Sequence, residues 1–257
     1  MSTLVRPSLS APDGASLDRA LARADAYRIL AAAFRDPDDA GADGELDLDT
    51  LRSATEDLGA SVDGELWRAL RLIREQKARA AEHRAIFGHV VAQGCPPYET
   101  EYGRRHVFGQ SQELGDIRGF YEAFGVRPRR GGERPDHLGC ELEFLALLAL
   151  KEATALAAGR DERRSVCRDA AARFIGDHAG RWLPAFAGRI AQRAPDGGYA
   201  AAAAIAAALV AEHGRELGAT PQTLEPEDLL PITDEPDGFS FECAIDVEGG
   251  DLAPPGS

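Results

Sequence analysis

Two short stretches of the chain carry most of the residues that could do chemistry. They are PPYETEYG at residues 96–103 and PDHLGCELEFL at residues 135–145. In the second stretch, Asp136 precedes an expected helix and is well placed to accept hydrogen bonds from the free N–H groups of its first turn. His137, Glu141 and Phe144 follow at helical spacing, so we expect them to share one face of that helix. A His–carboxylate pair one turn apart can fix a histidine tautomer or hold a charge.

The pair formed by His137 and Glu141 fits a metal half-site, an acid/base pair or a polar anchor for a peptide. A zinc site needs further ligands, and the other histidines show no metal-ligand spacing to each other or to cysteine. The chain also lacks the repeated Glu-x-x-His of di-iron helical bundles. We therefore predict no metal and no cofactor. A purely structural role, as a hydrogen-bonded pair under a loop, fits as well as direct binding.

Common enzyme signatures are absent from the sequence. There is no phosphate-binding P-loop, no dinucleotide-binding glycine fingerprint and no G-x-S-x-G nucleophile motif. The Arg104-Arg105 pair lies in the middle of the chain without a following hydrophobic stretch, so it is not an export signal of this protein. We predict that the protein is not an enzyme.

The apolar pattern predicts an all-α fold. Apolar residues recur at helical spacing in most of the chain, and no sustained period-two run enriched in β-branched residues occurs. The segment from His137 is apolar most of the way round, which places it at the centre of the bundle. The predicted helices cover residues 16–34, 48–58, 64–87, 114–124, 137–158, 163–177, 182–194 and 199–217.

Charge divides the chain into parts. The net charge is −14, and residues 222–257 hold ten acidic residues and no Lys or Arg. Residues 36–63 hold ten acidic residues against one basic residue. Such a balance argues against nucleic acid or an anionic membrane as partner. We expect a flexible N-terminus at 1–15, a single helical domain at 16–218 and an extended or disordered acidic, Pro-rich tail at 219–257.

The expected location is the cytoplasm. The four cysteines are widely spaced and too few for a disulfide framework, so reduced thiols are expected. No stretch of the sequence reaches the ~20 apolar residues of a membrane span, and residues 1–15 lack the apolar core of a signal peptide.

Several separated motifs resemble the TorD/DmsD/NarJ-type chaperones of redox enzymes. That family combines a Tyr-containing helix ending in Phe-Gly, then Pro-Asp-His, then Glu-x-x-Phe on the next helix. EHRAIFGH at 82–89 before the Pro-Pro-Tyr-Glu loop and FIGDHAGRWLPAF at 174–186 also match, so that the resemblance covers about residues 20–217. The residues that carry the central match are Tyr121, Phe124, Gly125, Pro135, Asp136, His137, Glu141 and Phe144.

The resemblance implies a cytoplasmic TorD-like helical bundle, monomeric or homodimeric, that binds the catalytic-subunit precursor of a molybdenum oxidoreductase. It would hold the precursor's twin-arginine signal back from export until the cofactor is inserted. The PPYETEYG loop looks most similar to the delta-subunit group that serves dimethyl sulfide, ethylbenzene, selenate or chlorate enzymes. A permanent accessory subunit of a redox complex and a metal-dependent helical enzyme are the alternatives.

A twin-arginine peptide offers two guanidinium groups and an apolar stretch, so its receptor needs carboxylates beside an apolar groove. Asp136 and Glu141 are the expected acceptors, with aromatic residues nearby in the sequence as the apolar wall. Each of these aromatic residues also fits an ordinary core position. Because the chain has no Met beyond Met1, the groove lacks flexible thioethers and one dedicated client is expected. The predicted client-binding residues are Tyr98, Glu99, Tyr121, Phe124, Pro135, Asp136, His137, Glu141 and Phe144.

Overall fold

The structure, a computed structural model, describes residues 14–37, 44–87, 95–103, 107–127 and 132–224. Residues 1–13 of the predicted flexible N-terminus and residues 225–257 of the predicted acidic tail lie outside these residues, while Gly14 and Ala15 already belong to the first helix. Within them the chain forms helices and no strand, apart from an isolated bridge between Tyr98 and His137. The all-α prediction is confirmed. The α-helices are α1 (Gly14–Phe34), α2 (Leu48–Leu58), α3 (Gly64–Leu70), α4 (Gln76–Phe87), α5 (Val107–Ala123), α6 (Leu138–Ala157), α7 (Asp161–Phe174), α8 (Gly180–Arg193) and α9 (Gly198–Leu217).

Several helix ends follow directly from local sequence. Asp47 precedes α2 and accepts a hydrogen bond from the Thr50 N–H at 3.0 Å, while Gly59 ends the helix in the left-handed conformation. Gly125 follows α5 with a φ of 80°, in the left-handed conformation that commonly ends a helix. Helix α1 begins at Gly14, two residues before the predicted start at residue 16, so that Ser16 lies inside its first turn.

The predicted helix over residues 64–87 is wrong in one respect, because it is broken into three pieces. Helix α3 passes into a 3₁₀ turn at Arg71–Ile73, and α4 begins at Gln76. Arg79 explains the break. Its buried guanidinium folds back along the chain and donates to the carbonyl oxygens of Ile73 and Arg74, at 3.4 and 3.2 Å, so these groups are satisfied without a continuous helix.

The predicted break between residues 177 and 182 is also wrong. The chain stays helical from α7 into α8 through a π-helical turn, Ile175–Ala179, in which the Gly180 N–H donates to the Ile175 carbonyl. Pro184 lies inside α8, where it has no N–H to donate to the carbonyl of Gly180 four residues earlier. The wider turn presents His178 and Trp182 to the interior, where both are buried.

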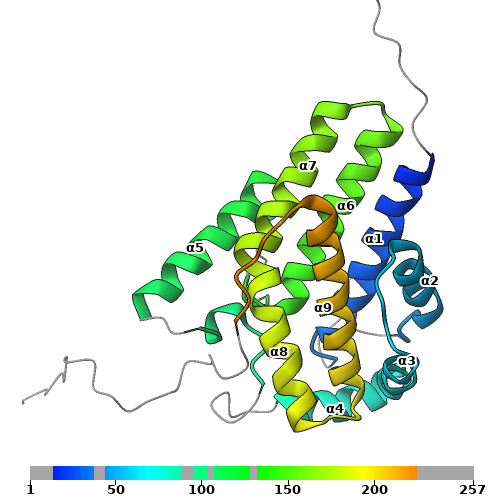
Figure 1. The fold of residues 1–257 in the computed structure, drawn as a ribbon. Helices are drawn as coiled ribbons and strands as arrows, with labels where there is room; N and C mark the ends of the chain where they lie inside the picture. Colours follow the sequence, from blue (N-terminus) through cyan, green and yellow to red (C-terminus); the bar gives the residue numbers. More distant parts are fainter. Residues whose placement is uncertain (1–13, 38–43, 88–94, 104–106, 128–131, 225–257) are drawn as a thin grey trace, which may run out of the picture.

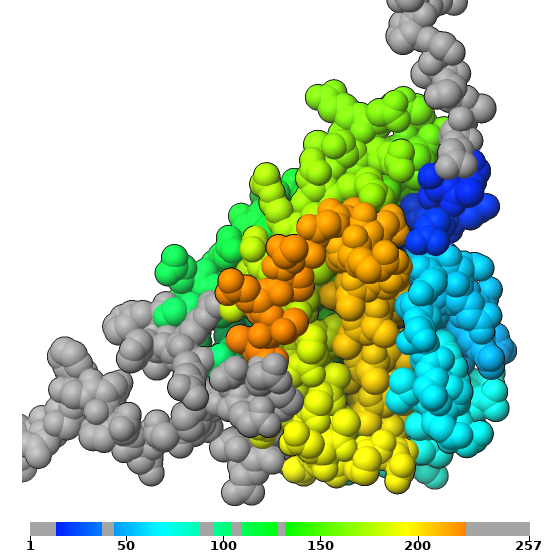
Figure 2. All heavy atoms as spheres, in the orientation of Figure 1, coloured from blue at the N-terminus to red at the C-terminus, as the bar shows by residue number. Residues whose placement is uncertain are grey.

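Helix α6 occupies the centre of the bundle, as predicted. It packs along α1 and α7, while α8 packs along α9 and α3 lies against α9 (Figure 1). Helix α5 lies at the edge beside α7 and α8. After α9 the chain folds back over α8 (Figure 2), and the Leu224 N–H donates to the Arg181 carbonyl at 2.8 Å. No helix in the described ranges is long and apolar enough to cross a membrane.

Candidate functional site

The two chemically loaded stretches lie side by side in the structure. The Leu138 N–H donates to the Pro97 carbonyl and the Glu99 N–H donates to the Asp136 carbonyl, both at 2.9 Å. The Tyr98 ring packs edge-on against His137, with ring centroids 5.3 Å apart. The loop at residues 95–103 is therefore fixed to the chain entering α6.

Asp136 holds this junction together, but it does not cap α6 as predicted. Its carboxylate is fully buried and accepts from the Thr100 N–H at 3.3 Å, the Thr100 hydroxyl at 2.8 Å and two Arg134 nitrogens at 3.0 and 2.8 Å. Four donors occupy both oxygens, so the side chain turns toward the loop and away from the helix N-terminus. Arg134 also lies 4.5 Å over the Tyr98 ring.

His137 takes the capping role instead. Its Nδ1 accepts from the Gly139 N–H at 3.0 Å, which requires the ring to be unprotonated at that atom. Burial lowers the pKa of His137 to about 4, so the neutral ring is the form present at neutral pH. The predicted pairing of His137 with Glu141 does not form in the structure. Although they lie one turn apart, the two side chains have different partners.

Glu141 belongs to a buried polar chain that runs across the bundle. It accepts from the Trp182 indole N–H at 3.0 Å, and burial together with the neighbouring charge of Glu99 raises its pKa well above the usual value. Glu141 is therefore a neutral acid whose proton can be shared with Glu99. Glu99 lies 3.2 Å from His178 Nδ1, and this contact raises the pKa of His178 although burial acts in the opposite direction.

Sequence reasoning placed Glu99 and Glu141 in the site but missed His178, Trp182, Thr100 and Arg134. His178 and Trp182 were contained in the matching FIGDHAGRWLPAF stretch, where the spacing of four residues puts them on one helical face. That spacing is the signal that could have found them. Thr100 and Arg134 become partners of Asp136 only through the loop conformation.

The aromatic residues predicted as an apolar wall are brought together. The Tyr121 hydroxyl donates to the Pro135 carbonyl at 2.7 Å, and its ring lies 4.8 Å from that of Phe144. Phe144 also packs on Phe174 and Phe124, with centroids 4.9 and 5.8 Å apart. Tyr121 and Phe144 are buried, while Phe124 is half-buried.

An open groove of about 510 Å³ lies beside this cluster, between the end of α1, the end of α5 and the first turns of α6; we call it the motif groove. Tyr121, Pro135, His137 and Phe144 line it, so four of the nine predicted residues face it. Glu99, Asp136 and Glu141 are buried outside its lining, and Tyr98 and Phe124 are not among the lining residues. The remaining lining residues are Arg35, Val126, Arg127, Gly132, Glu133, Gly139, Cys140, Glu143 and Leu147.

A second cavity of about 990 Å³ lies between α5, the π-helical turn and the segment after α9. Its charged lining residues are Glu113, Asp116, Asp177, His178 and Arg181. His178 Nε2 lies 3.3 Å from Asp116, so the buried polar chain reaches this cavity. No cluster of three or more metal-ligating side chains occurs in the described ranges.

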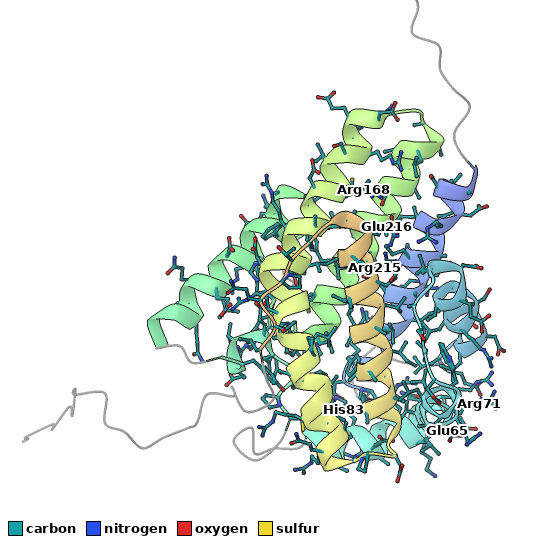
Figure 3. The ribbon with its side chains drawn as sticks, viewed as in Figure 1. Glu65, Arg71, His83, Arg168, Arg215 and Glu216 are labelled. Atoms are coloured by element: carbon teal, nitrogen blue, oxygen red, sulfur yellow. The ribbon has the colours of Figure 1, made fainter. Side chains whose placement is uncertain are left out.

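A separate ion network closes the opposite end of α6. Arg23 and Arg168 lie 2.6 and 3.1 Å from Glu216, and Arg168 lies 3.1 Å from Glu152. Figure 3 labels Arg168 and Glu216 on neighbouring helices. This network joins α1, α6, α7 and α9 far from the motif groove along α6. These ion pairs connect the four helices to one another.

Residues 55–188, just over half of the chain, match the family described as Nitrate reductase delta subunit. The chain is 39% identical over 115 residues to the chlorate reductase assembly chaperone protein of Ideonella dechloratans, covering 44% of this chain and 58% of the relative. It is 39% identical over 117 residues to the selenate reductase assembly chaperone protein of Thauera selenatis, with the same two shares. It is also 33% identical over 115 residues to the chaperone protein TorD of Vibrio cholerae, covering 44% of this chain and 50% of the relative.

These matches span between half and three fifths of the length of the curated relatives. No solved structure matches the chain significantly. Residues 55–188, which the family matches, contain the loop at residues 95–103, the buried polar chain and most of the motif groove. The chain belongs to the nitrate reductase delta subunit family, and it is similar to TorD-type, chlorate reductase and selenate reductase assembly chaperones.

Proposed function

We propose that this protein is a cytoplasmic assembly chaperone for a molybdenum-containing oxidoreductase. It binds the precursor of the catalytic subunit at its twin-arginine signal and keeps it from export until the cofactor is in place. The names of the chlorate reductase, selenate reductase and TorD relatives support the chaperone role over an enzymatic one.

The observation that carries the peptide-binding part of the proposal is the composition of the motif groove. Its apolar surface comes from Tyr121, Phe144 and Leu147, and the carboxylates of Glu133 and Glu143 also line it. An apolar surface beside carboxylates matches a segment with arginines followed by apolar residues. The groove therefore has the two chemistries that the client requires.

The buried carboxylates have a different part in this function. Asp136 and Glu141 are fully buried and already hold internal donors, so a client arginine would have to break the network to reach them. Leaving a buried charged partner unpaired is costly. We infer that they position the walls of the groove, while the carboxylates that line it contact the client.

A calorimetric titration tests the proposal. The full chain is titrated with a synthetic peptide that carries a twin-arginine pair followed by an apolar stretch, and in parallel with the same peptide in which both arginines are Gln. Saturable binding that weakens at least tenfold in the Gln peptide supports the proposal. No binding of the arginine peptide, or equal binding of both, contradicts it.

A further inference from the structure

Two charged side chains of the motif groove pair with each other and with nothing in the buried polar chain. Arg35 follows the last residue of α1, and Glu143 lies in the second turn of α6. Their guanidinium and carboxylate groups form an ion pair that joins the two helices where both line the groove. Glu143 has no other ion pair within the described ranges.

This ion pair is easy to open. The side chains of Arg35 and Glu143 are 49% and 46% exposed. Ion pairs that are this accessible to water contribute little to stability, because solvent screens the attraction and both long side chains lose freedom. The Arg35 N–H still bonds to the Ala31 carbonyl at 3.2 Å, so the side chain can swing away without unwinding α1.

The other acidic side chains at this end of the bundle make different contacts. Glu133 accepts from the Tyr98 hydroxyl at 3.1 Å and from the Arg134 N–H at 2.9 Å. Glu141 is buried and neutral, and the carboxylate of Asp136 already accepts from Arg134 and Thr100. Glu143 is thus the groove carboxylate whose only charged partner can leave into solvent.

We propose that Glu143 is the residue that selects an arginine of the client, and that Arg35 is an internal placeholder that occupies Glu143 while the groove is empty. The inference rests on the proposed function. On binding, one guanidinium–carboxylate pair replaces another, and Arg35 turns to solvent. A client side chain must therefore compete with a resident arginine before it can bind.

The placeholder sharpens specificity. A neutral side chain gains nothing from Glu143 and leaves Arg35 in place. A lysine presents a single compact charge, whereas an arginine offers a planar fork of donors that can bind both oxygens of a carboxylate. The exchange therefore favours arginine over lysine and over glutamine at this position of the client.

Three variants of the full chain test the proposal with the same twin-arginine peptide. Arg35→Gln is expected to tighten binding about threefold to fivefold, because the competitor is removed. Glu143→Gln is expected to weaken binding about tenfold and to abolish the preference for the arginine peptide over a lysine peptide. Arg28→Gln is the matched control, since it removes one positive charge from α1 outside the groove lining and does not free Glu143.

The outcomes separate the two proposals. Tighter binding by Arg35→Gln with little change in Arg28→Gln supports the placeholder. An equal gain in affinity in both arginine variants would mean that only net charge matters, which overturns the inference. No gain in affinity in Arg35→Gln, or a preference for the arginine peptide that persists in Glu143→Gln, overturns it as well. In each of these cases the proposed chaperone function still stands. If the unaltered protein fails to bind the peptide, the proposed function itself falls. Circular dichroism of each variant confirms that it is folded.

Discussion

Burial determines the protonation state of Glu141, and thereby what this residue can do. Its carboxyl group lies between the Trp182 indole and Glu99, and its raised pKa keeps the group uncharged. A neutral acid can accept from Trp182 with one oxygen and donate from the other. Its contribution is therefore to the geometry of the loop and helices, with no charge offered to a client.

The first prediction concerns the protonation of this residue. Glu141→Gln keeps an acceptor for Trp182 and supplies an amide donor toward Glu99, so we expect the unfolding free energy at pH 7 to change by less than about 1 kcal/mol. Glu141→Ala leaves the indole N–H without an acceptor and creates a cavity, so it should lower the unfolding free energy by about 2–4 kcal/mol. Urea denaturation of both variants measures the difference. Equal destabilisation by Gln and Ala would show that Glu141 is needed as a charge.

His137 carries a prediction about pH. Its pKa is about 4 in the folded protein, against about 6.5 for an unperturbed histidine, so the folded state binds fewer protons between these values. The stabilisation that this neutral group provides is complete above about pH 6.5 and is lost progressively as the pH falls from there through 4. His137→Asn keeps a capping side chain without titrating, and should lessen the loss of unfolding free energy between pH 6.5 and pH 4 by about 3 kcal/mol.

Urea unfolding of the two proteins from pH 7 to pH 4 provides the measurement, and taking their difference cancels the other titrating groups. A His137→Asn protein with the same pH slope as the unaltered protein would show that His137 is not the buried neutral cap described here.

At the scale of elements, the π-helical turn sets the orientation of α8. Residues 175–179 insert a wider turn, after which His178 and Trp182 reach the buried polar chain. Gly180 permits it, because a Cβ atom there would lie 2.5 Å from the Ile175 carbonyl oxygen. A Cβ on Gly176 would meet nothing within 4 Å.

This contrast gives a matched pair of glycine variants. Gly180→Ala should lower the unfolding free energy by about 1–3 kcal/mol, since the backbone of α8 has to shift. Gly176→Ala should be neutral or stabilising by up to about 1 kcal/mol, because alanine restricts the unfolded chain. Thermal unfolding of both variants distinguishes them. A Gly180→Ala protein as stable as Gly176→Ala would mean that the π-helical turn is not under this constraint.

Hydrophobic periodicity predicted helices such as α2 and α9 well, because their apolar stripes run without interruption between clear end signals. It failed where one side chain or one hydrogen bond changes the path of the backbone. Arg79 satisfies carbonyl groups that a continuous helix would have used, and the Gly180 N–H reaches five residues back to Ile175. Neither interaction has a repeating pattern in the sequence.

The candidate site was predictable in its location and less so in its chemistry. The two motif stretches do meet, and Tyr121, Pro135, His137 and Phe144 do line one groove. Spacing alone could not show that Asp136 turns toward Thr100 or that Glu141 is fully buried. Those outcomes depend on contacts between distant parts of the chain, such as Glu141 with Trp182.

For the whole molecule, the acidic C-terminal segment bears on how a cationic client arrives. Residues 225–257 contain ten acidic residues and no Lys or Arg. The last described residue before them, Leu224, lies against Gly103 at the end of the motif loop and bonds to the Arg181 carbonyl. The described chain therefore ends beside the loop at residues 95–103. Acidic residues of the following segment would attract an arginine-bearing peptide over a long range.

Truncation after Leu224 tests this role. We expect the association rate of the twin-arginine peptide to fall about threefold to tenfold at low salt, with little change in the dissociation rate or in thermal stability. A tail of the same length with its acidic residues replaced by Asn and Gln is the control, and should behave like the truncation. Stopped-flow fluorescence at low and high salt measures both rates, and a salt-independent association rate unchanged by truncation would rule out steering.

The central claim is that this protein binds an immature client and releases the mature one. The most direct measurement is native mass spectrometry of the purified full chain mixed with the molybdenum enzyme encoded by a neighbouring gene. One sample contains the cofactor-free precursor with its signal, and the other the cofactor-loaded enzyme without it. A complex with the precursor alone is the expected result. Equal binding of the mature enzyme, as a permanent subunit would show, or no complex with the precursor would contradict the claim.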